Sequence, residues 1–265
     1  MVLDQVFNED CLIGMDRIPD KSVDMILCDL PYGTTENKWD SAIPLDRLWE
    51  QYKRVLKRGG AVVLTCQIPF MIDLANSNRE WLRYEWIWQK SNPTGFLNAN
   101  RMPMKCHENV LVFYENLGKY NPQGIKQGRS QVSGSHSTNY GEYATRYKGL
   151  GKNYGEDRHR DYNVQQSTYD GLVNYPRDVI LFKKEGGIHP TQKPVALFEY
   201  LIRTYTDEGD VVLDNCMGSG TTAVACIRSG RHYIGFETDP VYYDVINERI
   251  SETKHIFNNN LDRWF

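Results

Sequence analysis

The stretch Val211-Val212-Leu213-Asp214-Asn215-Cys216-Met217-Gly218-Ser219-Gly220-Thr221-Thr222-Ala223 combines an apolar run, a glycine-rich turn and a run typical of a helix start. The apolar run predicts a buried strand over 211–213, and the pattern after the turn predicts a helix over 221–229. Glycine lets the turn approach a ligand closely, and the helix would direct the positive end of its dipole at that ligand. The stretch therefore predicts a ligand-binding turn at one edge of an α/β sheet.

An acidic residue, Glu237, follows the next predicted strand, which covers 232–236. A carboxylate at that position can accept hydrogen bonds from the hydroxyls of a ribose. Gly218-x-Gly220-x-x-Ala223 together with this acid also fits the fingerprint of dinucleotide-binding enzymes. These residues therefore predict an adenosine-containing cofactor, and an NAD-dependent oxidoreductase remains open at this point.

A second motif, Asp29-Leu30-Pro31-Tyr32, follows an apolar run over 23–28 that predicts another buried strand. An exocyclic amino group on a base is a poor nucleophile, and it needs hydrogen-bond acceptors when it attacks a sulfonium methyl. The Asp29 carboxylate and the Leu30 carbonyl offer two acceptors. Pro31 favours an extended backbone that directs this carbonyl outward, and Tyr32 offers a flat face for a base. The motif predicts methyl transfer to a base amino group.

Strand and helix patterns alternate through the rest of the chain, which is typical of a doubly wound α/β sheet with parallel strands. The strand over 81–89 carries Trp81, Trp86 and Trp88, which we expect in the core. The other predicted elements are strands over 61–65 and 109–114 and helices over 45–56, 194–205 and 240–250.

The pattern changes over 115–176, where glycine, serine, asparagine, glutamine and tyrosine replace the regular apolar spacing. Such a length is uncommon for a loop, so we interpret it as an inserted region between catalytic segments 1–114 and 177–265. Between Leu117 and Asp161 it holds eight basic and four acidic residues, which is typical of a phosphate-facing surface. The candidate DNA-binding residues are Lys126, Arg129, Arg146, Lys148 and Lys152.

The composition excludes several classes of protein. The chain has 265 residues, of which 40% are hydrophobic, and a net charge of −3. Its six cysteines include no C-x-x-C pair and no Cys/His cluster with zinc-site spacing, so we expect reduced thiols, a cytoplasmic location and no metal. No stretch approaches the roughly 20 apolar residues of a membrane span, and the N-terminus does not have the pattern of a signal peptide.

The order of the motifs resembles the beta class of DNA amino-methyltransferases, a circular permutation of the usual seven-stranded, Rossmann-like methyltransferase sheet. In this order Asp29 to Tyr32 comes first, the basic insertion second, His189 to Pro194 third and the glycine-rich turn last. The similarity covers nearly the whole chain, and it leaves out the insertion, which would be the target-recognition region.

The resemblance implies a role for each matching residue. Asp29, the Leu30 carbonyl and Tyr32 would hold a flipped base, with Pro31 shaping the motif. Leu30 stands where relatives commonly have proline, and Asp214-Asn215-Cys216 stands where they have Asp-Pro-Phe. The residues implied for the cofactor are Asp10, Cys11, Asp29, Thr191, Lys193, Asp214, Cys216, Gly218, Ser219, Gly220, Thr221 and Glu237.

The implied function is site-specific transfer of a methyl group from S-adenosylmethionine to N6 of a flipped-out adenine in double-stranded DNA, by an enzyme that is expected to form a homodimer. The nearest alternative is N4-cytosine methylation, and the aspartate at position 29 favours adenine by resemblance. Two further alternatives are a DNA-binding relative without turnover and the NAD-dependent oxidoreductase.

Overall fold

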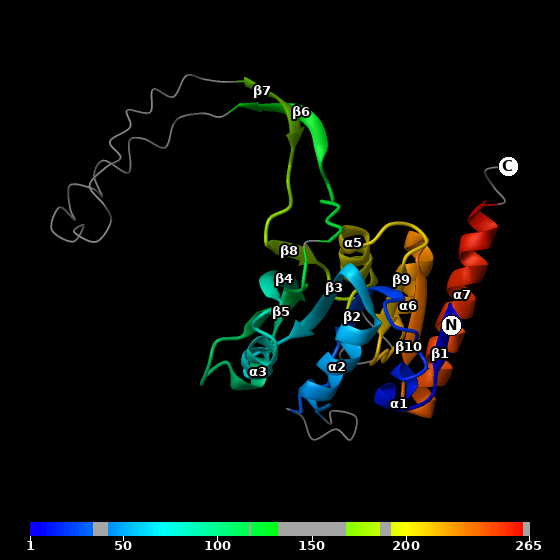
Figure 1. The fold of residues 1–265 in the computed structure, drawn as a ribbon. Coiled ribbons are helices and arrows are strands. Elements are labelled where there is room, and N and C mark those ends of the chain that lie inside the picture. The colour runs from blue at the N-terminus through cyan, green and yellow to red at the C-terminus, as the bar shows by residue number, and fades with distance from the viewer. Residues whose placement is uncertain (34–41, 117, 132–167, 186–191, 262–265) are drawn as a thin grey trace. The chain divides into compact units, whose positions relative to one another are not determined.

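The computed structural model describes residues 1–33, 42–116, 118–131, 168–185 and 192–261 (Figure 1). The chain divides into two compact units. The first, called the sheet unit, consists of Met1–Gln123 and Arg177–Phe265. The second, called the inserted unit, is Gly124–Pro176 and contains the antiparallel pair β6 (Lys126–Gln131) and β7 (Thr168–Val173).

An eight-stranded sheet forms the centre of the sheet unit, in the order β1-β10-β9-β2-β3-β5-β4-β8. Neighbouring strands are parallel except at β5, which runs antiparallel to both β3 and β4. The strands are β1 (Gln5–Phe7), β2 (Val23–Asp29), β3 (Leu56–Cys66), β4 (Leu82–Thr94), β5 (Lys105–Phe113), β8 (Val179–Phe182), β9 (Val211–Asp214) and β10 (His232–Phe236).

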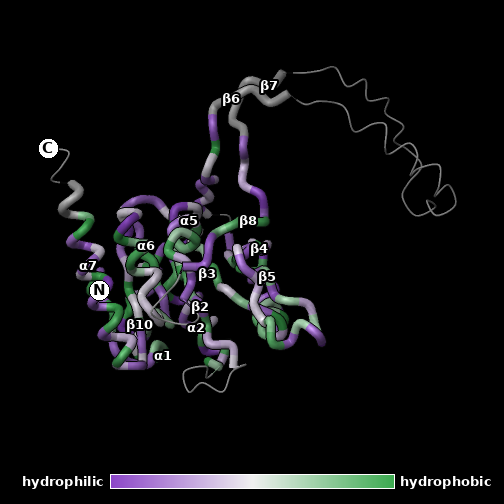
Figure 2. Tube along the Cα trace, turned by 180° about the vertical axis from the view of Figure 1, so that it is seen from behind, coloured by the Kyte–Doolittle hydropathy of each residue, from purple (hydrophilic) through white to green (hydrophobic). Residues whose placement is uncertain are grey.

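Helices cover both faces of this sheet. One hydrophobic cluster lies between the sheet and α5 (Val195–Tyr205), α6 (Thr221–Ser229) and α7 (Pro240–Leu261). The other lies between the sheet and α1 (Cys11–Met15), α2 (Leu45–Val55) and α3 (Phe70–Ser77). Successive side chains of β2 alternate between them, because Met25 and Leu27 belong to the first cluster and Ile26 and Cys28 to the second. Figure 2 shows hydrophobic stretches, in green, along strands of the sheet and along the helices that flank it.

The structure confirms the doubly wound α/β class and corrects two details. The sheet has eight strands instead of seven, and β5 makes it mixed instead of parallel. The sequence pattern missed β1 and β8, because strands of three and four residues carry little periodicity. The prediction that Trp86 and Trp88 belong to the core is confirmed, since both are at most 3% exposed.

The inserted unit begins nine residues later than the insertion expected from residue 115. Residues just before the boundary belong to the sheet unit, where the Asn121 backbone N–H donates to the Thr204 carbonyl at 2.7 Å. The assignment of 115–176 to target recognition stays a prediction.

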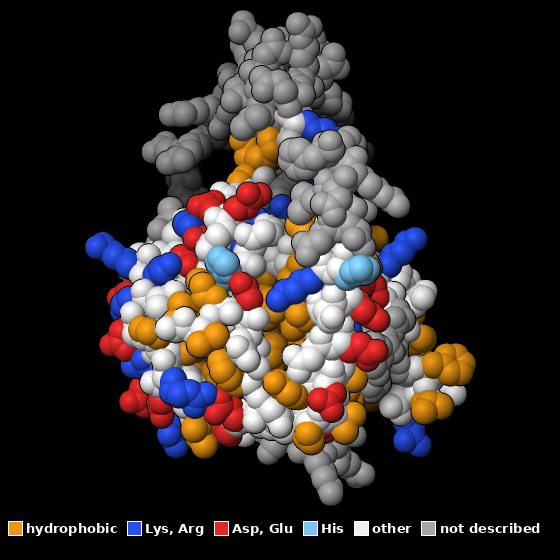
Figure 3. All heavy atoms as spheres, turned by 90° about the vertical axis from the view of Figure 1, so that its right-hand side faces the viewer, with side chains coloured by type: hydrophobic (Ala, Val, Ile, Leu, Met, Phe, Trp, Pro, Cys, Tyr) orange, Lys and Arg blue, Asp and Glu red, His pale blue; other side chains and the backbone are white. Residues whose placement is uncertain are grey.

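The surface of the described residues mixes charges of both signs. On the face drawn in Figure 3, acidic, basic and hydrophobic side chains are interspersed. None of the helices described is both long and apolar enough to cross a membrane.

Candidate active site

The two motifs that define the chemistry lie on neighbouring strands. Residues Met25 and Ile26 of β2 pair with Val212 and Leu213 of β9, and both strands run in the same direction. Asp29 and the glycine-rich turn therefore emerge at the same carboxyl edge of the sheet, although they lie far apart in the sequence. In open α/β sheets, ligands bind at this edge.

The glycine-rich turn is held by the acid that follows β10. Glu237 accepts a hydrogen bond from the Gly218 backbone N–H at 2.8 Å and from the Asp239 N–H at 2.9 Å. Gly218 and Gly220 both have positive φ values, of 55° and 82°, and Gly220 caps the N-terminus of α6. Burial raises the pKa of Glu237. The Glu237 carboxylate thus binds the backbone of a turn whose positive φ values only glycine adopts easily.

Asp214 stabilises the turn through hydrogen bonds to its side chain. Its side chain is buried and accepts hydrogen bonds from the Thr222 hydroxyl and from the Cys216 backbone N–H, the latter at 3.0 Å. Burial raises the pKa of Asp214 to about 6. Ser219 is also buried, and its carbonyl accepts from Arg249. These bonds fix the path of the backbone between β9 and α6.

A buried amide contacts two of the residues implied for the cofactor. The Asn215 amide contacts the sulfur atoms of Cys11 at 3.8 Å and of Cys216 at 3.4 Å. Its oxygen accepts from the Tyr52 hydroxyl at 2.5 Å. Asp10 caps α1 by accepting from the Leu12 N–H at 2.8 Å. The structure thus brings Cys11 and Cys216 together.

Neither of these two thiols is a candidate nucleophile. A hydrogen bond with Cys216 and burial raise the pKa of Cys11. The hydrogen bond with Cys11 acts to lower the pKa of Cys216, but a hydrogen bond with Cys28 and burial outweigh it and raise that pKa well above its ordinary value. A thiol that keeps its proton is a poor nucleophile. The two side chains therefore act as neutral, polarisable surface.

Asp29 receives three donors at the end of β2. Its Oδ1 accepts from the Tyr32 hydroxyl at 2.8 Å and from the Thr65 hydroxyl. Its Oδ2 accepts from the Lys193 ammonium at 2.5 Å. An ionised carboxylate has about four acceptor positions, so roughly one remains for a ligand. Thr65 pairs with Asp29 in the register of β2 and β3. The sequence alone does not reveal this register, so it could not identify Thr65 as a partner of Asp29.

Lys193 belongs to a buried row of alternating charges. Besides Asp29, its ammonium lies 3.3 Å from Glu108, and Glu108 accepts from Lys90 at 2.5 Å. The side chains of Lys90, Glu108 and Lys193 are each 7% exposed. Burial lowers the pKa of Lys193, but the carboxylates of Asp29 and Glu108 outweigh this effect and raise it. The ammonium keeps its proton and stays a donor.

Sequence reasoning missed Glu108 and Lys90 as site residues. An acid two residues before the apolar run Val110–Phe113 of β5 is the signal that could have pointed to Glu108, because a carboxylate that the strand buries requires a partner. Lys90 lies on β4, and the partner that it finds depends on the pairing of β4 with β5.

Tyr32 has an aromatic neighbour. Its ring stacks on Phe70 of α3 with 5.2 Å between centroids and 25° between planes. Burial and the charge of Asp29 raise the pKa of Tyr32 well above its ordinary value, so the hydroxyl remains a donor. The Leu30 side chain is 3% exposed, which anchors the motif in the core. Pro31, which follows it, is half-buried.

Several expected site residues fall outside what the structure describes. Thr191, Arg146, Lys148 and Lys152 lie outside the described residues, and so does the side chain of Arg129, whose backbone belongs to β6. Lys126 begins β6 and is exposed. Thr221 is buried, and its hydroxyl donates to the Lys193 carbonyl at 3.3 Å, which ties the glycine-rich turn to Asp29's partner.

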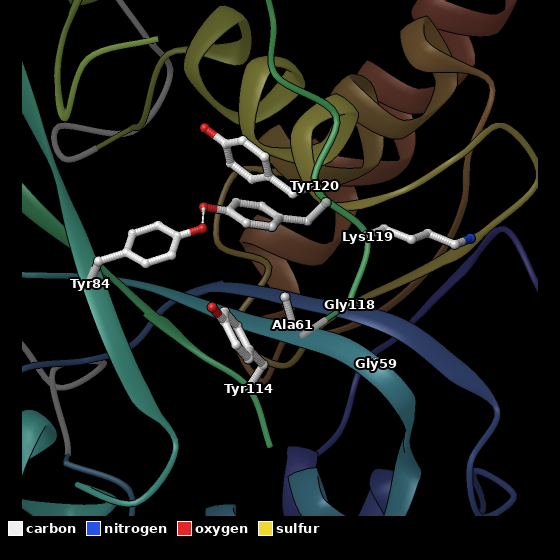
Figure 4. Close-up of a pocket in the computed structure, with 8 residues that line it drawn as sticks. Gly59, Ala61, Tyr84, Tyr114, Gly118, Lys119 and Tyr120 are labelled. Carbon is white, nitrogen blue, oxygen red and sulfur yellow. Dashed lines mark hydrogen bonds between the residues drawn. The ribbon is translucent and has the colours of Figure 1, made fainter. Parts of the chain in front are cut away.

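A separate cavity of about 510 Å³ lies at the opposite, amino edge of the sheet (Figure 4). Gly59, Ala61 and four tyrosines line it, and the Tyr84 and Tyr205 hydroxyls lie 3.0 Å apart. Lys119 points away from the tyrosine rings and pairs with Asp207 and Asp210. The cavity contains none of the residues of the two motifs, so we assign it no part in the chemistry.

The fold and the site together define an α/β protein with a glycine-rich turn beside an acidic strand end. A family model described as DNA methylase matches residues 23–248. The chain therefore belongs to this family of DNA methylases.

Two relatives resemble nearly the whole chain in sequence. The Type II methyltransferase M.HinfI from Haemophilus influenzae is 27% identical over 95% of this chain and 69% of its own length. The DNA adenine methyltransferase YhdJ from Escherichia coli is 28% identical over 94% of this chain and 83% of its own length.

Solved structures share the fold. The M1.HpyAVI complex with S-adenosylmethionine has a TM-score of 0.61 at 22% identity and covers 93% of this chain and 98% of its own. The cytosine-N4-specific PvuII DNA methyltransferase has a TM-score of 0.64 at 15% identity, covering 97% and 92%. A putative DNA modification methylase from Thermus thermophilus, complexed with S-adenosylmethionine, has a TM-score of 0.60 at 23% identity, covering 94% and 93%.

Proposed function

We propose that this protein transfers a methyl group from S-adenosylmethionine to N6 of an adenine in double-stranded DNA. The observation that carries the proposal is the placement of Asp29 and the glycine-rich turn on the adjacent parallel strands β2 and β9. The name of YhdJ, a DNA adenine methyltransferase, supports adenine as the target. We further propose a cytoplasmic homodimer.

The residues of the turn fit an adenosine cofactor. A methyl group added at Gly218 would meet only the Cys216 carbonyl oxygen, at 3.9 Å, so the turn leaves open space for a ligand. Glu237 would accept from the ribose hydroxyls, while Cys11 and Cys216 would lie against the adenine. When bound, S-adenosylmethionine supplies an electrophilic sulfonium methyl.

The residues at the end of β2 would hold the target base. The remaining acceptor position of Asp29 and the carbonyl of Leu30 would bind the two protons of the adenine amino group. These bonds leave the lone pair of the amino nitrogen available to attack the methyl group. Tyr32 would stack on the base, with Phe70 supporting its ring from behind. Lys193 would hold the Asp29 carboxylate in one orientation. The proton leaves after methyl transfer, so no strong base is required.

The inserted unit would bind the DNA backbone. Lys126 is exposed at the start of β6, and Arg129 follows in the same strand. We assign phosphate contacts to these two residues and to Arg146, Lys148 and Lys152, and target recognition to the insertion as a whole. Extrusion of the target base would cost a few kcal/mol of stacking and pairing.

The test is mass spectrometry of nucleosides digested from mixed-sequence DNA after incubation with the protein and isotope-labelled S-adenosylmethionine. Labelled N6-methyladenine is the expected product. Labelled N4-methylcytosine would instead identify cytosine as the target base. Absence of any labelled base, with cofactor binding demonstrated by calorimetry, would contradict the proposed activity on DNA.

A further inference from the structure

An exposed apolar tip projects from the sheet unit at the hairpin between β4 and β5. Leu97 is 96% exposed, Phe96 78% and Met102 53%. Single exposed apolar residues are common, but three on one short turn suggest a contact surface. We call residues 95–104 the β4–β5 tip.

The tip lies at the same edge of the sheet as Asp29. Asp29 pairs with Thr65 of β3, Thr65 with Val110 of β5, and Val110 with Trp86 of β4. Beyond the pair of Trp86 and Val110, the hairpin continues to the pair of Thr94 and Lys105, five residues along β5, a distance of about 16 Å at roughly 3.3 Å per residue. The tip therefore extends well past the carboxyl ends of β2 and β3, on the side where the target base would bind, and Figure 1 shows it beside α3.

The tip is an ordered structure. Gly95 adopts a positive φ of 90° and begins a short 3₁₀ turn, Phe96–Asn98. The Arg101 and Met102 backbone N–H groups both donate to the Asn98 carbonyl, at 2.8 and 3.0 Å. Lys105 ties the base of the tip to Gln67 at the end of β3, at 3.3 Å. The apolar side chains are thus presented on a braced turn.

The charge of the hairpin favours an anionic partner. Between Glu85 and Glu108 the chain contains no acidic residue, and it contains Lys90, Arg101 and Lys105. Lys90 is paired in the core, whereas Arg101 and Lys105 are exposed. The mixed charges on the face in Figure 3 differ from this single-sign segment. A duplex with a phosphate backbone and an apolar base stack matches both properties of the tip.

We propose that the β4–β5 tip is a DNA wedge: Phe96 and Leu97 enter the base stack beside the target adenine, and Arg101 binds the phosphate backbone. The proposal rests on the proposed function. Apolar side chains that enter a base step unstack it and occupy the space that a flipped base leaves. The wedge assists extrusion of the base, whereas Asp29 and Tyr32 act on the base once it is extruded.

The test uses a target sequence identified beforehand by methylation of mixed-sequence DNA. It compares two duplexes that each contain this target once. In the first duplex the target adenine is paired, and in the second it is mispaired and already destabilised. The variant is Phe96→Ser with Leu97→Ser. The matched control is Ile256→Ser, which removes another exposed apolar side chain, 61% exposed, from α7.

The double variant should lose about tenfold or more in kcat/KM on the paired duplex, which corresponds to about 1.4 kcal/mol. It should recover most of that loss on the mispaired duplex, because less unstacking remains to be done. The control should match wild type on both. Arg101→Gln should weaken binding and reduce the slope of log Kd against log salt by about 1.

Three results would overturn the wedge. Equal rates for the double variant and wild type on the paired duplex would show that the tip does not assist extrusion. An equal loss on both duplexes would assign the tip to another step. If the double variant changed its oligomeric state in sedimentation but methylated DNA as wild type does, the tip would be a contact between copies of this chain. Failure of wild type itself to methylate DNA would instead contradict the proposed function.

Discussion

At the scale of single residues, Asp29 is the group on which the proposed chemistry depends most. It accepts from three donors, Tyr32, Thr65 and Lys193, and keeps roughly one further acceptor position. The cofactor turn is held by other residues, Glu237 and Asp214. Base binding and cofactor binding should therefore respond separately to substitution.

Asp29→Ala should abolish methyl transfer, with kcat reduced by about 10² or more because a preorganised acceptor is lost. S-adenosylmethionine affinity should change by less than about threefold, since the turn does not depend on this carboxylate. Single-turnover kinetics and calorimetry would measure the two quantities. Retained turnover would remove Asp29 from its proposed role.

Glu108 is the buried counter-ion of two ammonium groups, Lys90 and Lys193. Glu108→Gln should lower the free energy of unfolding by about 3–5 kcal/mol, because it leaves buried positive charge without compensation. Glu85→Gln is the matched control on the neighbouring strand β4, where the acid is exposed and accepts from Asn109 at 2.7 Å. The control should change stability by less than about 1 kcal/mol. Urea unfolding of the three proteins at neutral pH would measure this.

The ion pairs of Glu108 with Lys90 and Lys193 also predict that stability depends on pH. Burial acts to raise the pKa of Glu108, but the ammonium groups of Lys193 and Lys90 outweigh it and lower that pKa. A lowered pKa in the folded state stabilises the protein above the unfolded value of about 4.3, and the stabilisation is lost as the pH falls through the folded pKa. The difference between wild type and Glu108→Gln should therefore shrink in acid. A difference that stays constant from pH 7 to pH 3.5 would contradict this account.

At the scale of elements, the turn from β9 to α6 combines positive-φ glycines with the proposed cofactor contact. Gly220 has a φ of 82°, and a methyl group there would lie 3.1 Å from the Ile246 side chain. Gly209 has the same φ, with nothing within 4 Å of an added methyl group, and it lies outside both motifs. The two glycines therefore separate the effect of backbone strain from that of the site.

Gly220→Ala and Gly209→Ala should each lose about 1–2 kcal/mol of stability from the left-handed conformation. Only Gly220→Ala should also weaken S-adenosylmethionine binding, because its shifted turn moves the backbone that faces the ligand. Thermal unfolding with and without the cofactor would measure both effects. A cofactor-induced rise in Tm that is equal in the two variants would count against the assignment of the turn.

At the scale of the whole molecule, the division into two units separates the proposed chemistry from the proposed target recognition. The sheet unit contains the entire eight-stranded sheet and every described residue of the two motifs. The inserted unit contains all five candidate phosphate contacts. Replacement of residues 124–176 by a short Gly/Ser linker should therefore leave cofactor binding and cooperative unfolding in place.

The shortened protein should lose DNA affinity and site selectivity. Each phosphate contact removed should reduce the slope of log K against log salt by about 0.9. Binding titrations at several salt concentrations, with calorimetry of S-adenosylmethionine as the control, would test this. Unchanged affinity and selectivity for DNA would contradict the assignment of recognition to the insertion.

The amino-acid sequence by itself determined the α/β class, most strands and helices, and the two motifs. Each of these depends on neighbours within about ten residues: apolar spacing defines a strand or helix, glycines define the turn, and Pro31 defines the end of β2. Local patterns could also assign Asp29 and Glu237 to strand ends, which suffices to predict a shared edge in a parallel sheet.

Only the tertiary structure decided the order of the strands and the partners of the buried charges. The reversed direction of β5 brings Glu108 beside Lys193, and the pairing of β4 with β5 brings Lys90 to the same carboxylate. It also places the β4–β5 tip at the edge that Asp29 occupies. These contacts join segments far apart in the chain, and the free energy that selects them comes from burial of both faces of the sheet, which no local pattern encodes.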